Sequence, residues 1–501
     1  MRLSNALHCR AFAVVAVVLV VVAQLLSAPD SDTAPSRLLM RFFYFPAGWS
    51  VSIFLLIVLA ARERAMCLGW ILACAGAGGL ASAAWEGSAN GLLRGLVGGA
   101  GVAPYLFALS GIVARSGTER SRWIDLFAVA SLIHISALAI PFFRNQTAQW
   151  LPRIVDLRIA ALDEAFGAQP SSAMANAFAA LPALHNLSLA AYALVQLPIV
   201  AVAAFHWKTK EPEEFSILPA FIIGSIIGFA CYWLTPAIGP RAYFGADFPL
   251  AHATAGYLAT LPLLDFDPAH FRNAMPSMHI AWALLAFLYA RGLPVWARFS
   301  VGAFVLLTAC ATLGFGEHYL VDLVVATPLV LLVRALCATG LHWADRARSR
   351  GAVTGLALLA FWIAAIRLAP SIAPPVALFL IALTVGVSAL LEGALACAEN
   401  GHARPKISAA PDSPDVLRHR DHFQGAARPR IFMPPRPRPR AEPDRQVIRG
   451  GGGGESSIGE EERANARPAP DSDRQPVHSV RQGNHQGILG VYQTCLPGAP
   501  E

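Results

Sequence analysis

The sequence predicts an all-α, polytopic membrane helix bundle of about twelve transmembrane helices, followed by a disordered C-terminal tail. Composition is the first observation behind this prediction. Of the 501 residues, 55% are hydrophobic and 14% are charged, whereas about 25% of the residues in a soluble domain are charged. The second observation is that the apolar residues are gathered into long runs, and about 20 such residues cross a bilayer.

The apolar runs define the expected helices. Small residues fill several of them, as in 73–79, and in lipid this composition favours close helix packing. The first run follows Arg2 and Arg10 and is interpreted as a retained helix, with a cleaved signal peptide as the alternative. The runs cover residues 11–28, 42–61, 65–84, 95–114, 123–143, 184–205, 215–235, 277–290, 299–315, 319–338, 351–369 and 375–396.

The positions of Lys and Arg predict the orientation, because these residues collect in short cytoplasmic loops. If the N-terminus is cytoplasmic, every second connection between the runs is basic. The N- and C-termini are then cytoplasmic, the 236–276 loop is non-cytoplasmic, and a bacterial-type plasma membrane is the expected location. The basic connections contain Arg62 and Arg64; Arg115, Arg120 and Arg122; Lys208 and Lys210; Arg291 and Arg298; Arg346, Arg348 and Arg350.

Two segments fall outside this helical pattern. The connection 144–183 contains a mixed polar and apolar stretch, 157–167. That stretch is interpreted either as an amphipathic helix on the outer surface or as a linker packed on the bundle. From about residue 398 the chain is rich in Pro and Arg and contains five consecutive glycines, 450–454. Such a composition cannot form a core, which predicts a disordered cytoplasmic tail.

Five polar residues at the mouths of the later runs carry the expected chemistry. His318 and Asp322 are four residues apart, which places them on one helical face. There the carboxylate could accept the Nδ1 proton and leave Nε2 free to attack. His279 begins another run and suits proton transfer. Ser277 with the adjacent helix N-terminus, and Arg241 with its forked guanidinium, could hold an anion.

The spacing of the two histidines predicts that they meet. Between them the chain has apolar runs at 280–290 and 299–315, joined by a basic turn. Those runs can cross a bilayer and return, which brings both imidazoles to the same membrane face. Together the residues favour displacement at phosphorus without a bound metal.

Each residue also has a plainer explanation. A histidine at a helix end is often only hydrogen-bonded, Ser277 could be an N-cap, and Arg241 could anchor in the headgroup layer. Two histidines and a carboxylate could also hold a metal. A chain with about twelve helices could be a transporter, although no internal repeat is found and the polar cluster lies at a boundary rather than at mid-membrane.

The motifs Pro276-Ser277-Met278-His279 and His318-Tyr319-Leu320-Val321-Asp322 resemble the second and third signatures of the type 2 phosphatidic acid phosphatase superfamily. The resemblance is closest to the inositol phosphorylceramide synthase and sphingomyelin synthase branch. It implies a six-helix catalytic core over about 123–340. The remaining predicted parts are N-terminal transmembrane helices (1–122), two C-terminal helices (341–397) and the tail (398–501).

The resemblance also implies roles. His318 would be the nucleophile that forms a phosphohistidine, and Asp322 would orient it. His279 would be the acid and base, while Arg241 and Ser277 would bind phosphate. No cofactor or metal is expected.

The sequence departs from the phosphatase pattern at three places. Ala311-Thr312 stands where Ser-Arg is expected, Trp233-Leu234 lies where a Lys is expected, and Met278 replaces a common Gly. Fewer cations favour a phosphodiester. The expected function is therefore transfer of a phospho-headgroup from a membrane phospholipid to an alcohol such as a polyol or a ceramide-like acceptor. Hydrolysis of a lipid phosphate is the alternative, and no nucleic acid is expected as a partner.

Overall fold

A computed structural model describes the chain over residues 46–59, 63–87, 89–209, 217–249, 264–265, 270–368 and 372–403. The predicted first helix at 11–28 and the predicted disordered tail from residue 404 onward lie outside these residues. All described residues lie within one compact unit of the chain, Met1–Asp412.

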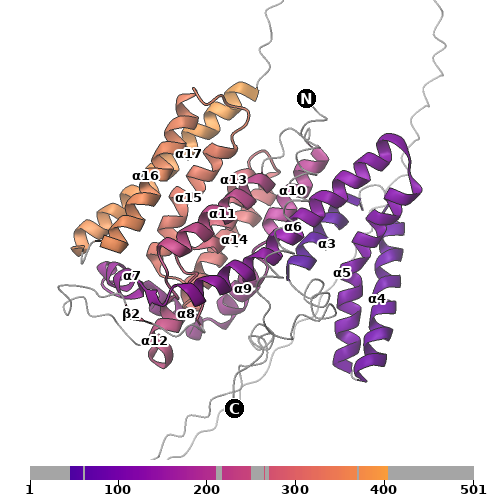
Figure 1. The fold of residues 1–501 in the computed structure, drawn as a ribbon, viewed down its shortest axis with the longest axis horizontal. Helices are drawn as coiled ribbons and strands as arrows, with labels where there is room; N and C mark the ends of the chain where they lie inside the picture. Colours follow the sequence, from indigo (N-terminus) through magenta and orange to yellow (C-terminus); the bar gives the residue numbers. More distant parts are fainter. Residues whose placement is uncertain are drawn as a thin grey trace, which may run out of the picture. The chain divides into compact units, whose positions relative to one another are not determined.

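The N-terminal part contains a closely packed helical pair, α4 and α5. In α4 and α5 the helices approach so closely that a Cβ on Gly78 would lie 2.4 Å from the carbonyl oxygen of Gly95, and one on Gly99 would lie 2.0 Å from that of Cys74. Figure 1 shows the two helices side by side. The small residues of the 73–79 run therefore permit close packing, as predicted. The helices here are α3 (Pro46–Leu59), α4 (Arg64–Glu86), α5 (Ala89–Ala114) and α6 (Gly117–Trp150).

The predicted connection at 144–183 is mostly helical. Helix α7 buries Ile159 and Leu162, so 157–167 corresponds to the packed linker and not to the amphipathic surface helix. The antiparallel strands β1 and β2 pair Arg153 with Asp265, which ties the loop before the Ser277 motif to this segment. The elements are β1 (Arg153–Ile154), α7 (Asp156–Asp163), η1 (Glu164–Phe166), α8 (Pro170–Ala180), α9 (Pro182–Ala193), α10 (Leu197–Thr209) and β2 (Leu264–Asp265).

Helix α15 is the centre of the C-terminal half and is buried along most of its length. It packs against α11, α13, α16 and α17. At its far end Arg334 forms ion pairs with Glu392 (3.2 Å) and Glu399 (2.6 Å) of α17. The elements are α11 (Ile217–Leu234), α12 (Pro240–Phe244), η3 (Gly245–Asp247), α13 (Met278–Tyr289), α14 (Val295–Gly314), α15 (Leu320–Cys337), α16 (Arg346–Leu368) and α17 (Pro374–Ala403).

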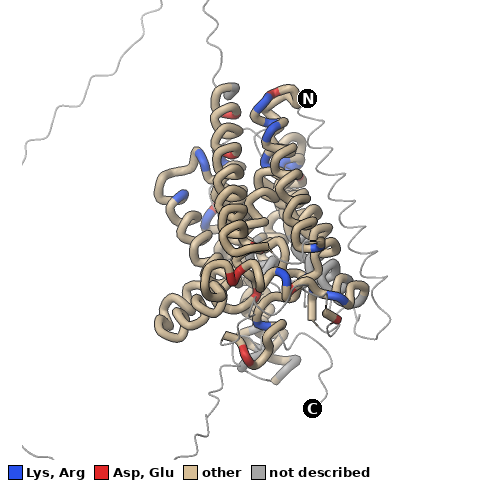
Figure 2. The backbone as a smooth tube through the Cα atoms, turned by 90° about the vertical axis from the view of Figure 1, so that its left-hand side faces the viewer, with Lys and Arg blue, Asp and Glu red and all other residues tan. Residues whose placement is uncertain are grey.

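The helical membrane class is confirmed. Seven helices in the described part are long and apolar enough to cross a membrane, or eight if a bent pair counts as one span. Figure 2 shows how few charged positions lie along them. The predicted count of twelve is not confirmed. The expected single crossing at 184–205 is broken into α9 and α10, which meet at 58°, and α13 has only 12 residues, or about 18 Å of helix.

Candidate active site

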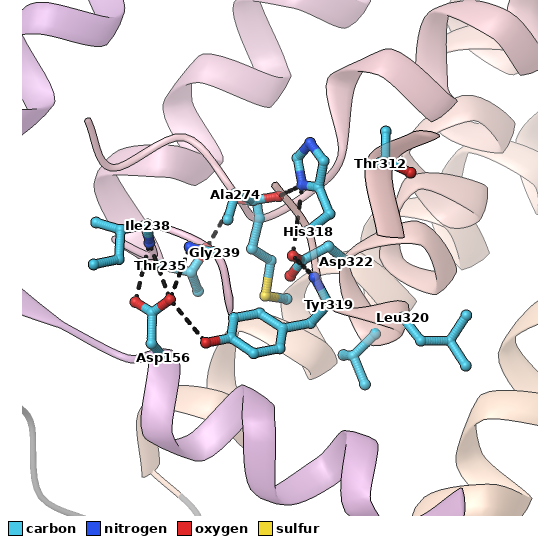
Figure 3. A network of polar contacts seen from close by, with 12 residues as sticks. Asp156, Thr235, Ile238, Gly239, Ala274, Thr312, His318, Tyr319, Leu320 and Asp322 are labelled. Carbon is cyan, nitrogen blue, oxygen red and sulfur yellow. Dashed lines mark hydrogen bonds and ion pairs between the residues drawn. The ribbon is translucent and has the colours of Figure 1, made fainter. Parts of the chain in front are cut away.

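His318 lies in the short connection between α14 and α15. The N–H groups of Glu317 and His318 both donate to the carbonyl of Thr312, at 3.1 and 3.0 Å, and this turns the imidazole inward, where it is 3% exposed. Its Nδ1 lies 2.7 Å from the carbonyl oxygen of Ala274 (Figure 3). A carbonyl can only accept, so Nδ1 carries the hydrogen and Nε2 keeps its lone pair.

Asp322 lies beside the His318 ring but does not accept the hydrogen of Nδ1. Its Oδ2 is 3.5 Å from His318 Nδ1 and accepts the N–H of Tyr319 at 2.8 Å. The expected acceptor of the Nδ1 proton was Asp322, whereas the structure assigns that role to the Ala274 carbonyl. The fully buried carboxylate is still close enough to stabilise a positive charge on the ring.

His279 meets His318 as the spacing predicted. The two ring centroids are 6.0 Å apart, with the planes at 65°. The His279 ring also stacks on Tyr192 of α9, with centroids 4.2 Å apart and planes at 16°. Tyr192 was not expected at the site, because nothing in the sequence indicates that α9 lies against α13.

An aromatic cluster continues from this stack. Phe315 lies in the turn before His318. The centroid of its ring is 5.2 Å from that of Phe178 of α8, 5.3 Å from that of His185 of α9 and 6.0 Å from that of Tyr192. These edge-to-face and tilted contacts fix the position of α8 and α9 beside the His318 turn.

Ser277 is the N-cap residue of α13 and is fully buried. Its N–H donates to the main-chain carbonyl of Asp322 at 3.1 Å, which joins the beginning of α13 to that of α15. Its Oγ has no hydrogen-bond partner within the described residues. A buried, unpaired hydroxyl at a helix N-terminus is suited to an anionic ligand.

Arg241 lies in α12, directly against the same turn. Its N–H donates to the carbonyl of Gly316 at 2.8 Å. Gly316 has φ +68°, and a Cβ there would lie 2.7 Å from Cβ of Arg241. Arg241 itself is exposed. All five predicted residues therefore come from segments that contact one another, with Arg241 adjacent through its backbone.

Two buried carboxylates of α7 also lie beside the site and were not expected there. Asp156 accepts the N–H groups of Ile238 and Gly239 and the hydroxyl of Tyr319. Asp163 accepts the N–H groups that begin α15. The available signal was their spacing of seven residues, which puts both on one face of a helix.

Burial controls the ionisation of these groups. Desolvation lowers the pKa of His318 to about 4, against the raising effects of Glu317 and of the Ala274 hydrogen bond. Burial raises the pKa of Asp156 to about 7 and that of Asp163 to about 8, while their backbone hydrogen bonds act in the opposite direction. His318 is therefore neutral near pH 7.

A metal site was the alternative interpretation of the two histidines and Asp322. Within the parts of the chain that the structure describes, no group of three or more His, Cys, Asp or Glu side chains is placed to hold a metal ion.

Comparison with known proteins confirms the resemblance seen in the motifs. Residues 157–336 match the PAP2 superfamily, and this segment contains all five predicted site residues. A phosphoinositol dihydroceramide synthase of Bacteroides thetaiotaomicron is 26% identical over 152 residues, which cover 28% of this chain and 50% of that protein. The chain thus spans about half the length of this relative. No solved structure matches.

Proposed function

We propose that this chain, which matches the PAP2 superfamily over residues 157–336, is a lipid phosphotransferase. It moves a phospho-headgroup from a membrane phospholipid to an alcohol through a phosphohistidine on His318. One observation carries the proposal. A neutral imidazole has its Nδ1 hydrogen held by Ala274, and a second imidazole, that of His279, lies 6.0 Å from it.

The first step forms a bond between Nε2 of His318 and phosphorus. The bond from phosphorus to the oxygen of the diacylglycerol-like alcohol breaks, and His279 as imidazolium gives that oxygen a proton. The phosphorylated ring keeps its Nδ1 hydrogen on the Ala274 carbonyl and becomes cationic. Asp322, 3.5 Å from Nδ1, stabilises that charge.

The second step reverses the roles. His279, now neutral, removes the proton of the acceptor hydroxyl, whose oxygen attacks phosphorus. The bond between nitrogen and phosphorus breaks and His318 returns to its neutral form. The same residues would support water as the acceptor, which would make the protein a lipid phosphatase.

The two helix N-termini at the site are not equivalent. The beginning of α15 is occupied, since Asp163 accepts the N–H groups of Leu320 and Val321. The beginning of α13 has the buried hydroxyl of Ser277, which is unpaired among the described residues. We infer that the phosphate oxygens lie at α13, and that Arg241 reaches the same phosphate from the neighbouring turn.

The substrate class follows from charge and from the relative. The site has few cations, which suits a singly charged phosphodiester. The relative's name couples a phosphoinositol group with dihydroceramide, so a phosphoinositol lipid and a ceramide-like acceptor are the first pair to test. In this proposal the termini are cytoplasmic, the site faces the non-cytoplasmic side of a bacterial-type plasma membrane, and no cofactor takes part.

The test uses membranes with the full chain, headgroup-labelled phospholipid and candidate alcohols. Wild type should give labelled product on the alcohol, and His318→Ala should abolish it. The matched control is His342→Ala, because His342 is an exposed histidine in the turn after α15. Transfer that persists in His318→Ala would refute the nucleophile. Water-soluble headgroup phosphate as the only labelled product would show that water is the acceptor.

A further inference from the structure

Asp156 organises the loop that leads to Arg241. The carboxylate is fully buried and accepts the N–H of Ile238 at 3.0 and 3.1 Å and that of Gly239 at 2.9 Å. Gly239 is two residues before Arg241, and its φ of +90° places a Cβ there 2.3 Å from the carbonyl oxygen of Glu317. A displacement of this loop would therefore move both Arg241 and the turn that carries His318.

The same loop also supports the acceptor of the His318 hydrogen. The N–H of Ala274 donates to the carbonyl of Ala237 at 3.0 Å, and the carbonyl of Ala274 accepts from His318 Nδ1 at 2.7 Å. Asp156 thus reaches the nucleophile through the loop backbone and these two hydrogen bonds. It also touches the residue after His318 directly, since the Tyr319 hydroxyl donates to Oδ1 at 3.2 Å (Figure 3).

Asp163 acts on the other side of His318. Its two oxygens accept the N–H groups of Leu320 at 2.7 Å and Val321 at 3.0 Å. These are orphan donors of the first turn of α15, which would otherwise need water or a local cap. Asp163 therefore fixes where α15 begins, two residues after the nucleophile.

We propose that α7 is a two-carboxylate clamp, in which Asp156 and Asp163 hold the Arg241 loop and the His318 turn in register. Both are positioning residues for the transfer reaction, and this role rests on the proposed function. The two carboxylates are seven residues apart, about two turns of helix, so one rigid face of α7 holds both segments. Burial of two carboxylates is costly, and the backbone hydrogen bonds that they accept offset this cost.

Kinetic measurements separate the roles of Asp156 and Asp163. Asp163→Asn, which keeps one acceptor oxygen, should lower kcat about tenfold with little change in KM, and Asp163→Ala should lower it further. Asp156→Asn should also raise KM for the lipid donor, because the Arg241 loop moves. In an Arg241→Ala background the added effect of Asp156→Asn on KM should vanish, since the loop then carries no guanidinium.

A matched control separates positioning from general stability. Asp345 caps α16 by accepting the N–H groups of Ala347 at 2.8 Å and Arg348 at 3.4 Å, beyond the opposite end of α15. Asp345→Asn should leave kcat and KM unchanged per folded molecule. An equal loss of transfer in Asp345→Asn would overturn the clamp.

Hydrogen exchange on the purified full chain tests the clamp without relying on activity. Asp156→Asn should accelerate exchange at Ile238 and Gly239, and Asp163→Asn at Leu320 and Val321, by about tenfold or more relative to wild type. Unchanged exchange at these amides would contradict the clamp. If the wild-type protein neither transfers a headgroup nor hydrolyses a lipid, the proposed function fails. The exchange result still decides the clamp on its own.

Discussion

At the scale of single residues, the tautomer of His318 is set by a group that cannot titrate. The Ala274 carbonyl holds Nδ1 at 2.7 Å, so the orientation of the ring does not depend on the ionisation of Asp322. This leaves the carboxylate, 3.5 Å away, for a separate task. In the proposed mechanism, this task is to stabilise the cationic ring that would form when phosphorus is bound.

Asp322→Asn tests this division. The substituted side chain would retain an oxygen for the Tyr319 N–H and leave the Ala274 bond intact, but it carries no charge. We expect kcat for headgroup transfer to fall on the order of 100-fold, as for loss of one electrostatic stabiliser of a transition state, with KM nearly unchanged. Steady-state kinetics on purified enzyme measure both. An unchanged kcat would show that Asp322 has no electrostatic role.

The buried His318 predicts a pH dependence of stability. Its folded pKa of about 4 lies below the ordinary 6.5, so the unfolded chain binds more protons between these values. Stability is therefore fully present above pH 6.5 and is lost as pH falls towards 4, by up to about 3 kcal/mol. Thermal unfolding of wild type and His318→Gln should converge over this range as the pH falls. Parallel curves would contradict the shifted pKa.

The stack of Tyr192 on His279 predicts a graded effect. Tyr192→Phe keeps the ring and should retain most of kcat, whereas Tyr192→Ala removes the contact. A stacked aromatic pair contributes about 0.5–1.5 kcal/mol, so we expect kcat to fall roughly threefold to tenfold in Tyr192→Ala. The effect should be absent in a His279→Ala background. A loss of the same size there would show that Tyr192 does not act through His279.

At the scale of elements, two turn glycines differ in their surroundings: Gly316 lies beside the site, and Gly292 lies in the turn between α13 and α14. Gly316 and Gly292 have φ of +68° and +88°, so an alanine strains both, but only Gly316 also has neighbours within 3 Å, Arg241 and Phe248. Left-handed strain alone costs about 1–2 kcal/mol. We expect Gly316→Ala to abolish most transfer per folded molecule, and Gly292→Ala to lower only the melting temperature. Equal activities of the two variants would contradict the close packing of Arg241 on this turn.

Most elements could be predicted from the apolar runs, because hydropathy is a local property. The runs at 215–235 and 319–338 correspond to α11 (Ile217–Leu234) and α15 (Leu320–Cys337) almost to the residue. The run at 184–205 was wrongly taken as one helix. Pro198 is the second residue of α10, and a proline lacks the N–H that would continue the helix from α9.

The site was predictable in part for a related reason. His318, Asp322 and His279 lie at the mouths of helices that return to one face, and sequence spacing is enough to bring them together. Asp156 and Tyr192 contact residues that are distant in the sequence, Ile238 and His279, and no local pattern predicts which partners they meet. The same holds for Ala274, whose role depends on its carbonyl and not on its side chain.

At the scale of the whole molecule, the arginine pattern predicts the orientation, and the site loops provide a direct test. Asp247 is exposed in η3, near Arg241, and Ser300 is exposed near the start of α14, at the end opposite His318. With the native cysteines replaced, Asp247→Cys should react with an impermeant thiol reagent on intact cells. Ser300→Cys should react only after the membrane is permeabilised.

Both outcomes are needed, because each position controls for the other. If both cysteines react from outside, the membrane is leaky or α14 does not cross it. If only Ser300→Cys reacts, the site faces the cytoplasm, and the lipid donor and acceptor would have to come from the inner leaflet. The reaction at His318 would be unchanged, since its geometry depends on Ala274, Asp322 and His279 and not on the side of the membrane.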